Sequence, residues 1–168
     1  MVAEFPYQIV VFLDRFPGIG EPVYYGKNGW YAQLAIKRRF KFISGDESDL
    51  LEMLEDYFSN IKPFNIETLS VKSDERMPVR FIDVNQSEEL ISLHNNLINF
   101  LGDKIISRYP ERDGINYYPH VTAEYNGEDI IDVNKYSKRT YPVRSVWLLK
   151  DVEDENSVLS AHLLLKSF

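Results

Sequence analysis

The chain has 168 residues, 44% of them hydrophobic and 27% charged, which is typical of one globular domain with its own core. It contains no cysteine, and this excludes disulfides, thiolate nucleophiles and cysteine-ligated zinc. A net charge of −7 argues against a broad nucleic-acid-binding surface, although residues 36–41, IKRRFK, gather four cations.

The start of the chain, MVAEFPYQIVVFLDRF, has an acidic residue before a short apolar run, unlike the basic lead of a signal peptide. No apolar run approaches the roughly 20 residues that a membrane span needs. We therefore expect a soluble cytoplasmic protein that is a monomer and has no membrane partner.

The first half of the chain predicts strands followed by a helix. Residues 7–13, YQIVVFL, form the continuous apolar run of a central strand, and the Pro- and Gly-rich 14–22 forms a loop. Residues 29–43 indicate a strand, or a hairpin whose second arm is 35–43. A leucine stripe behind a cap at Ser44 or Asp46 then predicts a helix.

The second half predicts a hairpin, a helix and further strands. Two alternating runs, 64–73 and 78–85, indicate an antiparallel hairpin. Residues 87–102 are typical of a helix, with Ser87 as its cap and Gly102 at its end. A polar loop (108–116) leads to a strand within 117–127, and strands at 141–151 and 157–168 close the chain. This order favours an α+β fold with antiparallel sheet.

The stretch 117–127, YYPHVTAEYNG, places an imidazole and a hydroxyl two residues apart. Because side chains alternate along a strand, His120 and Thr122 are predicted on one face. Tyr118 and Glu124 belong to that face, while the other face is formed by Pro119, Val121, Ala123 and Tyr125.

The basic run 36–41 shows a second polar face. Strict alternation puts Lys37, Arg39 and Lys41 on one face, and Arg38 with Phe40 and Phe42 on the other. If this face and the face of His120 line one cleft, the cations there are suited to binding a phosphate. Thr122 can then donate to a phosphate oxygen, and His120 can transfer a proton. The alternatives are a solvated edge strand for the basic run and an exposed strand face without function for His120.

YPHVTAEY resembles the second His-x-Thr signature of the two-histidine phosphoesterase superfamily, which includes the 2′-5′ RNA ligase-like and cyclic phosphodiesterase proteins. The order of strands and helices is similar over nearly the whole chain. The resemblance implies a single two-lobed domain over residues 1–168, with two antiparallel sheets lining a central cleft and helices on the outer faces. It also implies two histidines on opposite sides of a phosphodiester, one accepting and one donating a proton, with no metal or other cofactor.

The first His-x-Thr signature is replaced in this chain. We align Arg39-Phe40-Lys41 with it, so that Arg39 stands in place of the histidine and Lys41 in place of the threonine. Arginine stays protonated at any working pH and cannot take over acid–base work. Losing one such group typically costs on the order of 10²–10⁴ in rate. A weak or altered reaction is therefore expected, with phosphate affinity retained.

The remaining histidines and aromatic residues have plainer interpretations. His94 falls on the apolar stripe of a helix and is predicted to be packed, and His162 in the last strand is predicted to be structural or at the surface. Their scatter makes a metal site improbable. Tyr118 is the favoured base-stacking residue, since it shares the face of His120. Other aromatic residues are either stacking candidates or core: Tyr24, Tyr25, Trp30 and Tyr31.

The leading hypothesis is a phosphoesterase-like protein that binds a phosphorylated ligand, either a nucleotide or an RNA end. In it His120 is the catalytic acid or base, Thr122 assists and binds phosphate, and Arg39 and Lys41 clamp the phosphate. The rival is a catalytically inactive module on the same fold that binds a nucleotide or a protein.

Overall fold

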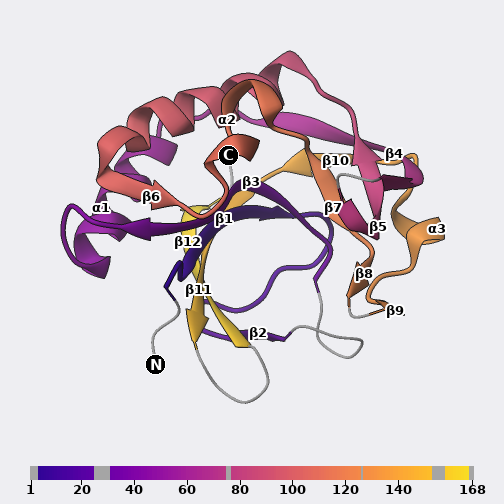
Figure 1. Cartoon of the computed structure of the whole chain (residues 1–168), viewed down its shortest axis with the longest axis horizontal. Helices are drawn as coiled ribbons and strands as arrows, with labels where there is room; N and C mark the ends of the chain where they lie inside the picture. Colours follow the sequence, from indigo (N-terminus) through magenta and orange to yellow (C-terminus); the bar gives the residue numbers. More distant parts are fainter. Residues whose placement is uncertain (1–3, 25–30, 75–76, 126, 153–157, 167–168) are drawn as a thin grey trace.

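The computed structural model describes residues 4–24, 31–74, 77–125, 127–152 and 158–166. They form an α+β fold in which a large antiparallel sheet curls beneath two helices, so the predicted fold class is confirmed (Figure 1). The helices are α1 (Glu47–Phe58), α2 (Glu88–Leu101) and the short α3 (Val133–Tyr136). The strands are β1 (Tyr7–Phe12), β2 (Pro22–Tyr24), β3 (Gln33–Phe42), β4 (Phe64–Asp74), β5 (Met77–Val84), β6 (Ile105–Ser107), β7 (His120–Thr122), β8 (Glu124–Tyr125), β9 (Glu128–Asp129), β10 (Thr140–Val143), β11 (Ser145–Val152) and β12 (Val158–Lys166).

The large sheet has the strand order β10-β4-β5-β7-β3-β1-β11-β12-β2, with β6 paired to the far end of β3. Its two halves meet where β7 pairs with β3, at the single register pair Leu34–Val121. The two predicted sheets are therefore continuous through this seam. β8 and β9 form a separate two-stranded ribbon.

The two long helices begin at side-chain caps. Asp46 accepts from the backbone N–H of Asp49, whose side chain accepts from the N–H of Asp46, a reciprocal capping box. Ser87 caps α2 by accepting from the N–H of Leu90, and Gly102 follows the last turn with a positive φ of 47°. Among the described residues, no helix is long and apolar enough to cross a membrane.

The curled sheet has two differently packed faces. The helix face is buried under α1 and α2 in a core that includes Ile9, Val11 and Leu148. The alternate residues of the same strands, such as Val10, Phe12 and Trp147, pack together on the opposite side. We call this second side the open face. Because side chains alternate along a strand, the face that a residue occupies follows from its register.

Strand β3 breaks the simple alternation through bulges. Its pairing with β1 shifts register twice, between Val10 and Ile9 and again between Ile9 and Tyr7. Ile9 lies opposite Lys37 and Tyr7 lies opposite Phe40, so three steps on β3 match two on β1 in this interval. Since directly paired residues share a face, Lys37 and Phe40 both point to the helix face.

The segment 141–151 forms two strands where one was predicted. β10 pairs with β4 at one end of the sheet, and β11 pairs with β1 and β12 in the other half. The break falls at Arg144, and the chain passes from one half of the sheet to the other there. Only the two polar residues Arg144 and Ser145 interrupt the apolar run there, and so short an interruption did not reveal the crossing.

Candidate functional site

Strand β7 presents His120 and Thr122 on the open face. Val121 between them is fully buried in the helix-face core, as the alternation predicts. On the neighbouring β5, Asp83 lies opposite His120 and Phe81 opposite Thr122. The rings of Phe81 and His120 meet edge to face, with centroids 5.5 Å apart. The shared face predicted for His120 and Thr122 is therefore confirmed.

One nitrogen of the His120 ring is held by the backbone. Nδ1 lies 2.9 Å from the carbonyl oxygen of Tyr118, a group that can only accept a hydrogen bond. Nδ1 therefore carries the proton, and in the neutral ring the lone pair is on Nε2. This tautomer leaves Nε2 as the nitrogen able to take up a proton.

The surroundings of His120 favour its neutral form. The pKa of the imidazole is lowered to about 4, chiefly by burial and also by the nearby cations Arg38 and Arg112, while the Tyr118 carbonyl and Asp83 act in the opposite direction. His120 is thus uncharged at neutral pH, in a site whose charge comes from guanidinium groups.

Arg38 is the basic residue that reaches His120, and this corrects the expectation that Arg39 would do so. Nη2 of Arg38 lies 3.2 Å from both Nδ1 and Nε2 of the imidazole. Because the two distances are equal, the guanidinium nitrogen is not aligned with the lone pair of one ring nitrogen. The physical reason is the β3 bulge, which takes Arg38 out of the strict alternation.

The three cations predicted to share a face are separated. Nζ of Lys37 is fully buried on the helix face, Arg39 forms an ion pair with Asp151 of β11 at 2.5 Å, and Lys41 is exposed. The expectation of one face for Lys37, Arg39 and Lys41 is therefore wrong. A phosphate-binding role for Arg39 and Lys41 stays a prediction.

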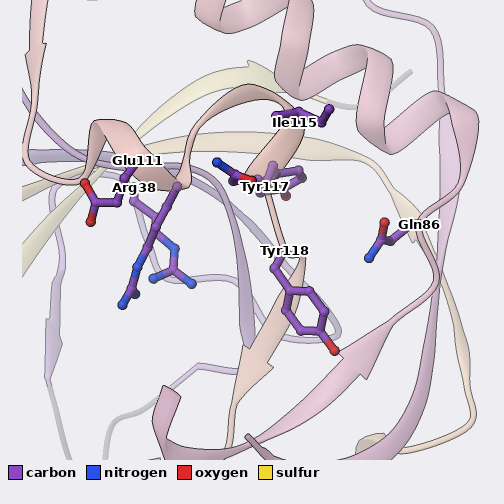
Figure 2. A pocket seen from close by; sticks show the side chains of 8 residues that line it. Arg38, Gln86, Glu111, Ile115, Tyr117 and Tyr118 are labelled. Atoms are coloured by element: carbon purple, nitrogen blue, oxygen red, sulfur yellow. The ribbon is translucent and has the colours of Figure 1, made fainter. Parts of the chain in front are cut away.

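A pocket of about 570 Å³ lies next to two residues that contact His120, and Figure 2 shows the side chains that line it. Arg38 and Tyr118 line it, and both also lie against the His120 ring; the ring centroids of Tyr118 and His120 are 6.5 Å apart. The other lining residues come from the loop before β7 and from the turn after β5: Gln86, Glu111, Arg112, Ile115, Asn116 and Tyr117.

A buried polar cluster fastens this loop to β3. Nζ of Lys37 donates to Oγ of Ser107 at 2.6 Å and lies 3.0 Å from Oδ2 of Asp113. Oγ of Ser107 also donates to Oδ2 of Asp113, at 2.9 Å. Each charged group in this cluster thus has a partner, which offsets the cost of burying it.

His94 fastens the same loop from the helix side. Its Nδ1 donates to the carbonyl of Ile36 at 2.7 Å, and its Nε2 accepts from the backbone N–H of Gly114 at 3.0 Å. Its ring is 1% exposed and stacks on Tyr117 with centroids 3.8 Å apart. The predicted packed histidine is confirmed, and it also anchors the loop that lines the pocket.

The other candidates lie away from His120 or beyond what is described. His162 is in β12, opposite Leu148, and only its backbone is described. Tyr31 lies on the open face, edge-on to Phe12. Trp30 and Tyr25 fall outside the described residues. In the described ranges, no group of three or more His, Cys, Asp or Glu could hold a metal ion.

Sequence reasoning missed Arg112, Asp113 and the role of Arg38. Arg112 and Asp113 lie in what the sequence presents as an ordinary polar loop, and nothing local marks them. Lys37 gave no clearer signal, because it is followed directly by Arg38 and Arg39 and so looks like part of one basic run.

Comparison with known proteins places this geometry in a family. Residues 39–154 match the model of the 2′-5′ RNA ligase superfamily. This match spans more than half of the chain, and the chain therefore belongs to that superfamily. No curated protein matches the chain.

Solved structures share the fold over nearly the whole chain. E. coli LigT in complex with 3′-AMP is 14% identical, with a TM-score of 0.62 over 97% of this chain and 96% of that one. A Thermus thermophilus protein, TT0787, is 15% identical, with a TM-score of 0.60 over 96% of each chain. E. coli LigT in complex with phosphate has a TM-score of 0.55 at 14% identity, covering 96% of this chain and 98% of that one.

Proposed function

We propose that this protein binds the phosphate of a nucleotide or of an RNA end on the open face, between Arg38 and the His120–Thr122 strand. The observation that carries the proposal is the contact between the Arg38 guanidinium and the His120 imidazole, with Nη2 3.2 Å from both ring nitrogens. A permanent cation lies against a titratable ring there, and a hydroxyl is on the same strand face two residues away. These are groups that bind phosphate oxygens.

Each residue has a defined part in this binding. Arg38 supplies a fork of N–H donors for two phosphate oxygens. The hydroxyl of Thr122 donates to a third oxygen, and Tyr118 offers its ring to the base. The structures of E. coli LigT with 3′-AMP, with ATP and with phosphate support a phosphorylated ligand on this fold.

Isothermal titration of the purified protein with 3′-AMP tests the proposal. We expect saturable binding that weakens on the order of tenfold in Arg38→Gln, since one charge-assisted contact is lost. Lys62→Gln is the control, because it removes an exposed cation from the loop between α1 and β4, to which no part in phosphate binding is assigned. Binding that is absent in the wild type, or that both variants weaken equally, contradicts the assignment.

Slow opening of a 2′,3′-cyclic nucleotide is the second candidate function. The Tyr118 carbonyl holds the proton on Nδ1, so that Nε2 of His120 can accept a proton from water as its oxygen attacks phosphorus. The phosphorus–oxygen bond to the leaving ribose hydroxyl breaks, and solvent must protonate that oxygen because an arginine occupies the place facing His120. The rate is expected to be low, since one acid–base group contributes about 10²–10⁴.

Turnover of 2′,3′-cyclic AMP by wild type and by His120→Ala separates the two candidates. If the rate in the His120→Ala variant falls to the uncatalysed rate in solution, the result supports the reaction. Equal rates in both proteins remove His120 from any mechanism, and if these rates are also that of solution the protein is a binding module without chemistry.

A further inference from the structure

The pocket beside His120 is lined by two arginines from separate parts of the chain. Arg38 belongs to β3 and Arg112 to the loop before β7. Both keep their charge at all working pH values. Glu111 also lines the pocket, so two cations stand against one carboxylate.

The fold holds these two like charges near each other. Arg112 is among the charged groups that lower the pKa of Arg38, which places the two guanidinium groups within electrostatic reach. Their chain neighbours Lys37 and Asp113 form the buried ion pair of 3.0 Å that fastens the loop to β3. An attraction one residue away thus offsets the repulsion between the guanidinium groups.

Two guanidinium groups suit a ligand with more negative charge than a phosphodiester. An internal phosphodiester carries a single negative charge, whereas a terminal phosphate monoester carries about −1.5 to −2 at neutral pH and offers three acceptor oxygens. Arg38 and Arg112 provide forked donors for those oxygens.

We propose that Arg38 and Arg112 together select a terminal phosphate monoester over a phosphodiester. The inference rests on the proposed function and specifies its ligand class: a mononucleotide or a nucleic-acid end that bears a free phosphate. Arg38 contacts the phosphate together with His120. Arg112, which lines the pocket, neutralises the second negative charge of the monoester.

A matched pair of ligands tests this selection. Adenosine 3′-monophosphate and adenosine 3′-(methyl phosphate) differ only in one ester methyl group and the charge that it removes. At neutral pH and low salt we expect the monoester to bind about tenfold more tightly, as expected for one additional charge-assisted contact. The low salt matters because exposed charge interactions are screened.

A matched pair of variants identifies the arginine responsible. Arg112→Gln is expected to bring the ratio of the two affinities close to one, with little effect on the diester. Arg108→Gln is the control, because Arg108 stacks on the same Tyr109 ring, at 5.2 Å against 5.3 Å for Arg112, but does not line the pocket. Arg108→Gln should retain the tenfold ratio.

The outcomes separate this inference from the proposed function. Equal or tighter binding of the diester by the wild type overturns the selection while leaving phosphate binding intact. A ratio that Arg112→Gln leaves unchanged, or that Arg108→Gln lowers just as far, also overturns it. If neither ligand binds, the proposed function itself fails.

Discussion

Lys37, which is buried, and Asp113, which is 16% exposed, form an ion pair, and they are the chain neighbours of Arg38 and Arg112. Lys37 is 0% exposed and desolvation lowers its pKa, while Asp113 and Ser107 supply its hydrogen bonds. The pair joins β3 to the loop before β7, 76 residues further along the chain. The arrangement of the pocket therefore depends on this contact.

Asp113→Asn is expected to destabilise the protein by about 3–5 kcal/mol, because it leaves the Lys37 ammonium buried without a counter-charge. Asp151→Asn is the matched control, since it breaks the partly exposed Arg39 pair and should cost less than about 1 kcal/mol. Urea unfolding of both variants measures the difference. Similar losses in the two would show that the Lys37 pair contributes no more than a surface contact.

His94→Phe is expected to lower the free energy of unfolding by about 1–3 kcal/mol. The phenyl ring can still stack on Tyr117, but the Ile36 carbonyl and the Gly114 N–H lose their partner. Hydrogen exchange at the Gly114 amide should accelerate in the variant. Unchanged protection of that amide would show that His94 does not anchor the loop.

The free energy of unfolding is expected to decrease as the pH is lowered, because of His120. Its pKa is about 4 in the folded protein, below the ordinary value of about 6.5 in the unfolded chain. Between these values the unfolded chain binds more protons, so the stability present above about pH 6.5 is lost as pH falls toward 4, on the order of 3 kcal/mol. Burial is the main cause of this lowered pKa; Arg38 and Arg112 act in the same direction, and the Tyr118 carbonyl and Asp83 oppose it.

Urea unfolding at pH 7 and at pH 4.5 measures the effect in wild type and in His120→Gln. The variant has no imidazole to protonate. Its free energy of unfolding should therefore decrease less than that of the wild type between pH 7 and pH 4.5. Equal losses in both proteins would mean that His120 titrates normally in the folded state.

Tyr118→Leu tests the base-stacking role predicted for this residue. Tyr118 lines the pocket beside His120, and one stacked base typically contributes about 1–3 kcal/mol. We expect weaker binding of 3′-AMP and unchanged binding of inorganic phosphate, which serves as the internal control. If both ligands weaken alike, Tyr118 acts by positioning His120 and not by stacking.

Local sequence patterns were sufficient to predict both long helices and the part of the site that lies on β7. The caps at Asp46 and Ser87 and the leucine stripes act within a few residues, so both long helices could be predicted. His120 and Thr122 share a face because β7 follows regular alternation. The crossing at Arg144 could not be predicted, because β10 and β11 find their partners far away in the sequence.

The sequence by itself determined that this is an α+β chain with an imidazole and a hydroxyl on one face of one strand, and with two adjacent arginines on another strand. The tertiary structure decided which arginine meets the imidazole. Bulges form where two strands must match register across the sheet, and no residue within β3 specifies their position. They turn Lys37 toward Asp113 and bring Arg38, not Arg39, to His120.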